Sequence, residues 1–320
     1  MRKICSMWYN RRSQKDLKGG FMLSFKKVEP SDIKDIQKLL QYQEFRTCDF
    51  TSGAIFMWRD YFYSEFAIYK DMLIFKVAYP KRGTSFSFPI GNGSTDEAIK
   101  AIEQYVLDNN VDLKYCTLPE KAMEYVKYRY GDKCHFLTNR DWYDYLYSAE
   151  SLKYFKGKKY HGQRNHVNRF KREYPDYKYV RINEDNLDRV IELFDKMFLP
   201  SEDAGKSERV EAMRARQYLN HFLSFNHLGG FIEVEGEVVA FALGEVVKDT
   251  LYVHVERANT DYHGSYQMIV SEFAKDYATE DVIYINREDD VGDPGLRKSK
   301  LSYKPIRLLE KYCADIELFE

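Results

Sequence analysis

Cysteine is scarce and scattered in this chain, which has 320 residues, five cysteines and no C-x-x-C pair. Structural zinc sites depend on closely spaced ligand pairs, and secreted disulfide frameworks need an even, patterned set of cysteines. The scatter therefore argues against a metal site built from cysteine and predicts a reduced, cytoplasmic protein. The cysteines are Cys5, Cys48, Cys116, Cys134 and Cys313.

An excess of one charge is also missing, because 49 Lys and Arg face 50 Asp and Glu, for a net charge of −1. A protein that coats nucleic acid would carry a broad positive surplus, so nucleic-acid contacts would need a local cluster. No apolar run approaches the ~20 residues that span a bilayer, and we expect no transmembrane segment. The sequence has no G-x-x-x-x-G-K-[ST] loop and no G-x-S-x-G elbow, which leaves nucleotide hydrolysis and serine hydrolysis without support.

What the chain does have is material for a core, with 44% hydrophobic and 16% aromatic residues. Its length is sufficient for two domains of ordinary size. The first 20 residues are basic and lack the apolar core of a signal peptide. We therefore expect residues 1–21 to be a disordered extension, with Met22 as an alternative translation start.

Two distant segments follow one plan, "FKKVEPSDIKDIQKLL" and "YVRINEDNLDRVIELF". Each is typical of a strand, an N-cap and an amphipathic helix, and the two align without a gap. Ser31 or Asp32 is the expected cap in the first segment, and Asp185 or Asn186 in the second. This match indicates an internal repeat.

Both halves then continue with antiparallel strands, a helix and another strand. Tight turns are expected at 70–71, 235–236 and 248–249. The order predicts an α/β (α+β) protein in which mixed central sheets are flanked by helices. We expect a first domain over residues 22–150 and a second, with the active site, over residues 151–320; the strand order is that of the GNAT acyltransferase fold.

Four stretches carry a resemblance to a known family: "KKYHGQRNHVNRF", "VAFALGE", "VHVERANTDYHGSYQMI" and "YINREDDVGDPGLRKSKLSY". They resemble the family related to the C-terminal domain of phosphatidylglycerol lysyltransferase. The resemblance covers most of residues 22–320 and implies tandem GNAT-like domains, akin to the Fem-type aminoacyltransferases. It further implies transfer of an aminoacyl or acyl group, from aminoacyl-tRNA or acyl-CoA, to an amine or hydroxyl.

The stretch "YVHVERANTDYHGSYQ" contains the candidate catalytic residues. Strand alternation puts His254 and Glu256 on one polar face and two valines on the other. By the resemblance, the loop "NTDYHGSY" is where GNAT enzymes hold the donor's phosphates, at a helix N-terminus and with Gly264 allowing close approach. It has one glycine where two small residues are usual, so a plain loop and helix start is the alternative. A metal at the histidines and acids of this stretch is not expected, because a loop separates the ligand pairs.

The segment from Lys153 to Arg172 contains eight Lys or Arg residues and no acid. In a chain of balanced charge this asymmetry favours a strip that binds phosphates, of tRNA or of an anionic head group. The alternative is a solvated linker helix. Arg164 and Asn165 belong to the stretch that resembles the family.

The charged stretch that follows "DVIYI" begins at Arg287 and emerges where a strand of the second sheet ends. Opposed charges this close seldom stay unpaired, so we expect a network that lines a cleft; an ordinary surface loop is the alternative. Arg287 can pair with Glu288, with Asp289 or with Glu256 on the neighbouring strand. Arg297 and Lys300 can share one face of the helix that follows.

These observations favour an acyltransferase that needs no cofactor or metal beyond its donor substrate. Its acceptor would be a small molecule, a lipid head group or a peptide. Glu256 is the candidate base or amine-binding carboxylate, and Tyr266 the candidate proton donor. The alternative is a silent binding module that uses the same cleft for a charged small molecule or RNA.

The remaining candidate residues form two sets. The candidate donor or phosphate ligands are Arg164, Asn165, His263, Gly264, Ser265 and Arg297. The cleft network is His254, Asn286, Arg287, Glu288, Asp289, Lys300 and Tyr303.

Overall fold

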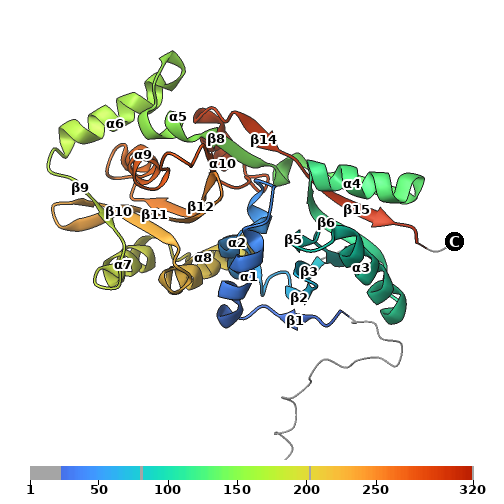
Figure 1. The fold of residues 1–320 in the computed structure, drawn as a ribbon. Coiled ribbons are helices and arrows are strands. Elements are labelled where there is room, and N and C mark those ends of the chain that lie inside the picture. Colours follow the sequence, from blue (N-terminus) through green and yellow to red (C-terminus); the bar gives the residue numbers. More distant parts are fainter. Residues whose placement is uncertain (1–22, 80–81, 202, 319–320) are drawn as a thin grey trace, which may run out of the picture.

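The computed structural model describes residues 23–79, 82–201 and 203–318, in which the strands form two mixed sheets flanked by helices (Figure 1). The extension expected at residues 1–21 lies outside the described residues. Among these residues, no helix is long and apolar enough to cross a membrane.

The first sheet draws mainly on the first half of the chain. Its helices are α1 (Ile33–Leu40), α2 (Ser52–Trp58), α3 (Thr95–Asn109) and α4 (Glu120–Tyr130). Its strands are β1 (Lys26–Lys27), β2 (Glu65–Tyr69), β3 (Met72–Tyr79), β4 (Gly83–Phe86), β5 (Ile90–Gly91), β6 (Leu113–Pro119), β7 (Cys134–Thr138) and β15 (Lys311–Ile316).

The second sheet draws mainly on the second half. Its helices are α5 (Ala149–Tyr154), α6 (His161–Glu173), α7 (Leu187–Met197), α8 (Lys206–Leu219), α9 (Ser265–Tyr277) and α10 (Pro294–Ser302). Its strands are β8 (Asp144–Ser148), β9 (Lys178–Arg181), β10 (Leu228–Val234), β11 (Glu237–Val247), β12 (Thr250–Ala258), β13 (Tyr284–Asn286) and β14 (Arg307–Leu309).

The two sheets repeat one pairing scheme. In the first, the order is β1-β2-β3-β4-β6-β15-β7, and in the second it is β9-β10-β11-β12-β13-β8-β14. In each sheet the fourth and fifth strands of this order pair in parallel, β4 with β6 and β12 with β13, and the other pairs are antiparallel. The sixth strand of each sheet in this order, β15 in the first and β8 in the second, comes from the other half of the chain. The division of the strands between the two sheets therefore does not coincide with residue 150.

The expected turns form because the residues at each turn adopt left-handed backbone angles. Lys70 and Asp71 have φ of 45° and 62°, and Glu235 and Gly236 have φ of 52° and 87°. Two-residue turns with positive φ match the twist of antiparallel strands. Lys248, at the third expected turn, has φ of 53°. All three turn predictions are confirmed.

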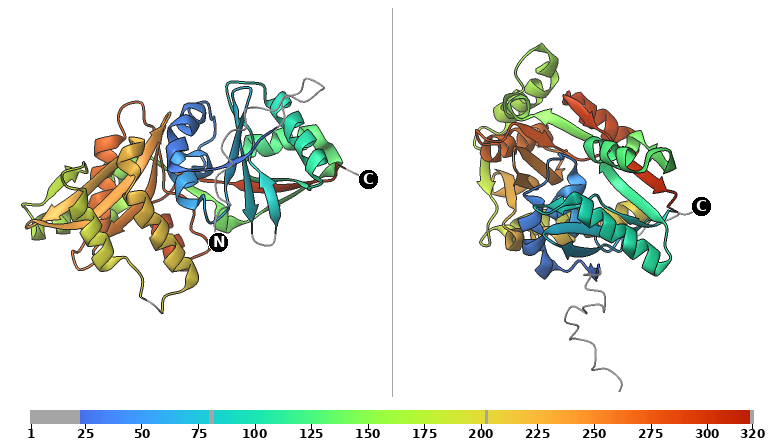
Figure 2. Two further views of the ribbon diagram at one scale, coloured as in Figure 1. Left: turned by 90° about the horizontal axis from the view of Figure 1, so that it is seen from below. Right: turned by 45° about the vertical axis from the view of Figure 1, so that its right-hand side comes forward.

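Helices cover both faces of the second sheet. One helix on this side of the molecule, α2, comes from the first half of the chain. α5 and α6 pack on α9, which lies on β10, β11 and β12, whereas α7 packs on the other face. α2 packs against α8, so that α1 and α2 lie between the two sheets, as Figure 2 shows in its left view. One apolar core runs from the first sheet through these helices to β10, β11 and β12. The halves therefore meet through a buried, apolar interface.

Candidate functional site

The candidate site lies where two parallel strands part. β12 pairs with β13 only over Thr250–Tyr252, opposite Tyr284–Asn286, and β12 then continues to Ala258 while β13 ends. Side chains beyond the last pair are free to face a ligand, as at the carboxyl ends of strands in open α/β sheets. We call this region, residues 253–258 and 287–290, the β12–β13 fork.

One ion pair crosses the β12–β13 fork. Arg287 Nη2 donates to Glu256 Oε1 at 2.6 Å, and the two side chains are only 10% and 11% exposed. The guanidinium also lies 4.5 Å from the ring centre of Tyr303. Tyr266 lies on the first turn of α9, and burial raises its pKa. The fold thus brings together Glu256, Arg287 and Tyr303, three of the residues predicted from the sequence.

A β-bulge places His254 differently from the expectation. The register of β12 shifts between Val253 and Val255, which leaves His254 as the extra residue and reverses the alternation. Val253 packs in the core beneath α9, whereas Val255 packs in the core shared with α7 and α8. His254 turns toward Glu245 on that second side, and Glu256 lines the side of α9. The prediction that His254 and Glu256 share a face is therefore wrong.

His254 is held between two carboxylates. Its Nε2 lies 3.0 Å from Glu245 Oε1 and its Nδ1 lies 2.7 Å from Glu288 Oε1. Burial disfavours the charged ring, but the two carboxylates outweigh burial and raise the pKa of His254 to about 9. Both ring nitrogens therefore donate, and a charged imidazolium joins β11 to the loop that carries Arg287.

The same hydrogen-bond chain continues into the first half of the protein. Ser52 Oγ donates to Glu245 Oε2 at 2.7 Å, and Gly53 N donates to Oε1 at 2.6 Å. Ser52 Oγ accepts from His227 Nε2, and His227 Nδ1 accepts from the Tyr218 hydroxyl, each at 2.7 Å. Burial lowers the pKa of His227 to about 4, so this ring is neutral. Burial opposes ionisation of Glu245, but the histidines and the Gly53 N–H outweigh it and lower its pKa to about 2.

This chain of residues was not predicted from the sequence. Glu245 ends the quoted stretch "VAFALGE", and a carboxylate within an apolar strand was a usable signal, because buried charges are rare without a partner. Ser52 and Gly53 gave no such signal, since their role depends on α2 docking on the second sheet. A Cβ on Gly53 would lie 2.4 Å from His254 Cδ2. The glycine is required for this close approach.

We expect the free energy of unfolding to fall as the pH rises from 6.5 to 9. The pKa of His254 is raised in the folded protein, from 6.5 to about 9, so its contribution is fully present below pH 6.5 and is lost as the pH passes the folded value. By linkage the loss is at most about 3 kcal/mol. Urea unfolding at several pH values measures it. His254→Gln should flatten the curve over this range, and an unchanged slope in this variant would contradict the assignment.

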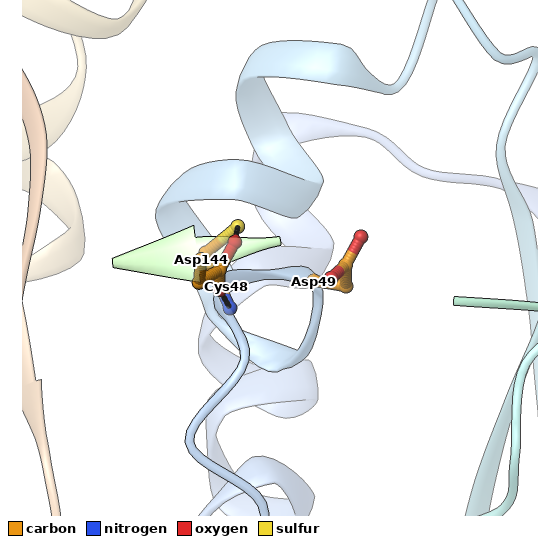
Figure 3. A group of neighbouring side chains, drawn as sticks. All are labelled: Cys48, Asp49 and Asp144. Carbon is orange, nitrogen blue, oxygen red and sulfur yellow. Dashed lines mark hydrogen bonds between the residues drawn. The ribbon is translucent and has the colours of Figure 1, made fainter. Parts of the chain in front are cut away.

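A second buried charge cluster lies beside the fork, on β8 and the turn 48–50 (Figure 3). Cys48, Asp49 and Asp144 offer ligand atoms within 4.8 Å of one another. Lys311 Nζ lies 2.7 Å from Asp144 Oδ1 and 2.8 Å from Asp49 Oδ2, and Asn286 Nδ2 donates to Asp144 Oδ2 at 2.8 Å. Burial raises the pKa of the Cys48 thiol well above its usual value. A neutral thiol and an ammonium suit an ion-pair cluster better than a metal site, and the expectation of no metal stays a prediction.

The outer part of the charged loop is held by its own ion pairs. Asp290, whose side chain is fully buried, accepts from Arg297 Nε at 2.9 Å and from the Tyr145 hydroxyl at 2.5 Å. Arg297 Nη2 also donates to Asp141 at 2.6 Å. Two aspartates thus bind the Arg297 guanidinium, and a role for it in holding donor phosphates stays a prediction.

The inner part of the loop is held by two lysines. Lys300 is buried and donates from Nζ to the backbone carbonyls of Arg287, at 2.6 Å, and of Asp289. Burial lowers the pKa of Lys300 and raises that of Asp289 to about 6. Asp289 Oδ2 lies 3.7 Å from Lys311 Nζ. These contacts fix the backbone from which Arg287 projects.

The loop before α9, expected to hold donor phosphates, packs against α6. Gly264 has φ of +89°, and a Cβ there would lie 2.4 Å from the backbone oxygen of His166. Ser265 Oγ donates to the carbonyl of Asn259 at 2.8 Å, and His263 is exposed. The close approach that requires glycine here is made by the backbone of α6.

Arg164 and Asn165 lie on α6 and make local contacts. Arg164 Nη1 donates to the carbonyls of Phe155 and Gly157, where α5 ends. Asn165 Nδ2 lies 3.3 Å from His161 Nδ1. Arg164 therefore holds the junction between α5 and α6, and phosphate binding by these two residues stays a prediction.

Comparison with known proteins decides the family. A family described as phosphatidylglycerol lysyltransferase, C-terminal, matches residues 41–315. The chain belongs to this family. A conserved protein of unknown function from Bacteroides thetaiotaomicron has 32% identity and a TM-score of 0.83, over 92% of this chain and 100% of the other.

Two further solved structures share the fold at low identity. L-PGS from Bacillus licheniformis has a TM-score of 0.62 at 16% identity, over 92% of this chain and 94% of its own. FemX has a TM-score of 0.58 at 8% identity, over 92% and 97%. At this level of identity, the two structures show only that the fold is shared with this chain. Family and fold point to a GNAT-like lysyl- or aminoacyltransferase domain, and the predicted resemblance and fold class are confirmed.

Proposed function

We propose that this protein is an aminoacyltransferase that moves an aminoacyl group from aminoacyl-tRNA to an amine or hydroxyl at the β12–β13 fork. The observation that carries this proposal is the Glu256–Arg287 pair across the fork, whose side chains are only 11% and 10% exposed. Tyr266, on the first turn of α9, is the proton donor in this proposal. A carboxylate can act as general base, a cation can stabilise developing negative charge, and a phenol can protonate the leaving oxygen when an ester is attacked.

The reaction follows from these three side chains. The acceptor nitrogen or oxygen attacks the ester carbonyl carbon, and a new C–N or C–O bond forms. Glu256 takes the proton that the nucleophile loses. The bond between the carbonyl carbon and the ribose oxygen breaks, and Tyr266 donates a proton to that oxygen. Tyr266 then regains a proton from solvent, and Glu256 releases to solvent the one that it took. The acceptor attacks the donor ester directly, so the enzyme forms no covalent intermediate, and positioning supplies much of the acceleration.

Two features favour aminoacyl-tRNA over acyl-CoA as the donor. The loop glycine that a pyrophosphate would need, Gly264, is already in contact with the backbone of α6. The segment 153–172 carries exposed cations on and before α6, among them Lys158, Lys159 and Arg172. A backbone of phosphates is bound by such a surface, and binding releases counterions.

The family description names lysyl transfer to phosphatidylglycerol. A lipid head group is therefore one candidate acceptor of this chain, beside small-molecule and peptide amines. Melting curves with acetyl-CoA, aminoacyl-tRNA and anionic lipid vesicles would discriminate among the ligand classes, because a ligand of the native state raises the melting temperature. We expect aminoacyl-tRNA to give a shift and acetyl-CoA to give none.

Salt dependence gives a sharper test of the donor. We expect tRNA binding to weaken steeply with salt, and the triple variant Lys158→Ala, Lys159→Ala, Arg169→Ala to flatten the slope of log K against log salt by about 0.7–0.9 for each phosphate contact removed. Fluorescence anisotropy with labelled tRNA measures the slope.

The matched control replaces three exposed lysines of α3 and α4, Lys100, Lys121 and Lys127, by alanine. It removes the same net charge far from α6 and should leave most of the slope in place. If both triple variants flatten the slope equally, only net charge matters. If the first keeps the parental slope, or no tRNA binds at low salt, the aminoacyl-tRNA hypothesis fails.

A further inference from the structure

Two ion pairs of opposite polarity hold the loop 287–290 to β12, one on each side of the strand. On the side of α9, Glu256 of β12 accepts from Arg287 of the loop at 2.6 Å. On the other side the charges are exchanged, and His254 of β12 lies 2.7 Å from Glu288 of the loop. Arg287 and Glu288 are neighbours in the chain, so a movement of Glu288 displaces the backbone that carries Arg287.

The backbone of Glu288 adopts a conformation that needs support. Its φ is 57°, in the left-handed region, which is uncommon for a residue other than glycine and costs free energy. Its N–H donates to Asn286 Oδ1 at 2.6 Å, and its carbonyl accepts from the N–H of Tyr145 at 3.1 Å. Its side chain reaches His254, and the two side chains are 22% and 0% exposed. The contact with the histidine is thus shielded from water, and an ion pair is stronger there than at an open surface.

The other end of this arrangement is anchored in the first half of the chain. Glu245 Oε1 lies 3.0 Å from His254 Nε2 and accepts from Gly53 N at 2.6 Å, while Oε2 accepts from Ser52 Oγ at 2.7 Å. A Cβ on Gly53 would lie 2.5 Å from His254 Nε2, so the start of α2 lies directly against the ring. A shift of α2 would therefore move the histidine and, through the loop, the β12–β13 fork.

We propose that His254 is a positioning residue of the aminoacyl transfer, which holds Arg287 against Glu256 while α2 is docked on the second half of the chain. The inference rests on the proposed function and adds the group that couples the two halves to the reacting groups. His254 does not itself touch substrate, because its side chain is 0% exposed. Its loss should disturb the placement of the guanidinium and leave the donor-binding surface of α6 unchanged.

The charge of the ring gives this role a pH dependence. The titratable groups that face it are Glu245 from β11, Glu288 from the loop, Tyr218 from α8 and His227, which directly precedes β10. Burial lowers the pKa of His227 to about 4 and raises that of Tyr218 well above its usual value, so both are neutral at pH 7. Burial also disfavours the charged ring of His254, but the two carboxylates outweigh burial and raise its pKa to about 9. Above this pH the ring loses a proton and one hydrogen bond to a carboxylate, and we expect kcat to fall.

Transfer rates measured against pH, with kcat and KM separated, test the positioning role. We expect His254→Gln to lower kcat by about 10–10²-fold, the cost of a small misplacement of the reacting groups, with the KM for the donor unchanged. The alkaline limb of kcat near pH 9 should disappear in this variant. Glu288→Gln removes one of the two charges that stabilise the imidazolium and should move the limb to lower pH. A parental kcat in His254→Gln, or an unmoved limb in Glu288→Gln, overturns the proposal.

Matched variants separate position from charge. Glu124→Gln, at an exposed glutamate of α4, removes the same charge as Glu288→Gln and should leave kcat and its pH profile unchanged. Gly53→Ala alters no charge, but its Cβ would press on the ring, so it should lower kcat as His254→Gln does. Ser52→Ala removes a donor to Glu245 without adding bulk and should lower kcat by a smaller factor, which keeps the test open if Gly53→Ala does not fold. All variants are assayed below their melting temperatures, and parental kcat in Ser52→Ala and in folded Gly53→Ala would overturn the coupling to α2.

Failure of this inference is distinguishable from failure of the proposed function. If the parent is active and His254→Gln is equally active, the inference alone fails. If the parent transfers no aminoacyl group, the proposed function fails, and hydrogen–deuterium exchange still tests the coupling without turnover. Residues 286–293 should then exchange faster in His254→Gln than in the parent, with α3 of the first sheet as the unchanged reference. Unchanged exchange of this segment would overturn the coupling whatever the activity.

Discussion

Replacing Glu256 by glutamine should leave the fold intact and lower kcat by about 10²–10⁴-fold, the usual loss when a general base is removed. The amide oxygen can still accept from Arg287 Nη2, so the pair across the β12–β13 fork keeps its hydrogen bond. The amide cannot take a proton from the attacking nucleophile. Single-turnover transfer from the donor, with the melting temperature measured in parallel, tests both parts.

The pH profile adds a readout that a structural role would not move. In the parent, the acidic limb of the rate should follow ionisation of the base, and in Glu256→Gln this limb should disappear. Glu280→Gln, an exposed glutamate after α9, is the matched control and should be silent. Full turnover in Glu256→Gln would assign the residue to the ion pair alone and favour the non-catalytic binding module.

Replacing Lys311 by methionine should cost about 3–5 kcal/mol of unfolding free energy, because it leaves the buried carboxylate of Asp144 and the partly buried one of Asp49 without their cation. Lys311 Nζ binds both Asp144 and Asp49, and its side chain is 3% exposed. The residue opens β15, directly after the chain has left β14 in the other sheet. Urea unfolding at neutral pH measures the loss.

A double variant separates the ion pair from simple packing. Lys311→Met combined with Asp144→Asn should lose less than the two single losses added together, since the second change removes one uncompensated charge. Lys298→Met, an exposed lysine of α10, should change stability by less than about 0.5 kcal/mol. Strict additivity of the two changes would mean that Lys311 acts through packing.

Local chemistry was enough to predict the elements and their order. The turn at 235–236 contains the glycine that positive φ favours. The spacing of apolar residues such as Val190 and Phe194 predicts the buried stripe of α7. Such signals depend only on neighbours within a few residues. The likeness of the two helix starts predicted an internal repeat, and the two sheets share one pairing scheme.

The exchange of strands between the halves was beyond such signals. β8 and β15 each pair in the sheet of the other half. The apolar pattern of a strand shows which of its faces is buried, but it does not specify the strand with which it pairs. For the same reason the cluster of Lys311, Asp49 and Asp144 could not be foreseen, because it exists only where the chain crosses from one sheet to the other. Sequence alternation also failed at His254, where one extra residue in β12 reverses the faces.

The sequence by itself determined the two-sheet α/β class, the family and the short list from which Glu256, Tyr266, Arg287 and Tyr303 came. Those properties follow from periodicity, turn chemistry and motif, all of which are local. Tertiary structure alone decided that Glu256 pairs with Arg287 across the fork and that Gly264 contacts α6. It also decided that Ser52 and Gly53 of the first half hold Glu245 of the second. These contacts join residues far apart in the chain. The pairing of β12 with β13, the docking of α2 beside β11 and the packing of α6 on α9 bring their side chains together.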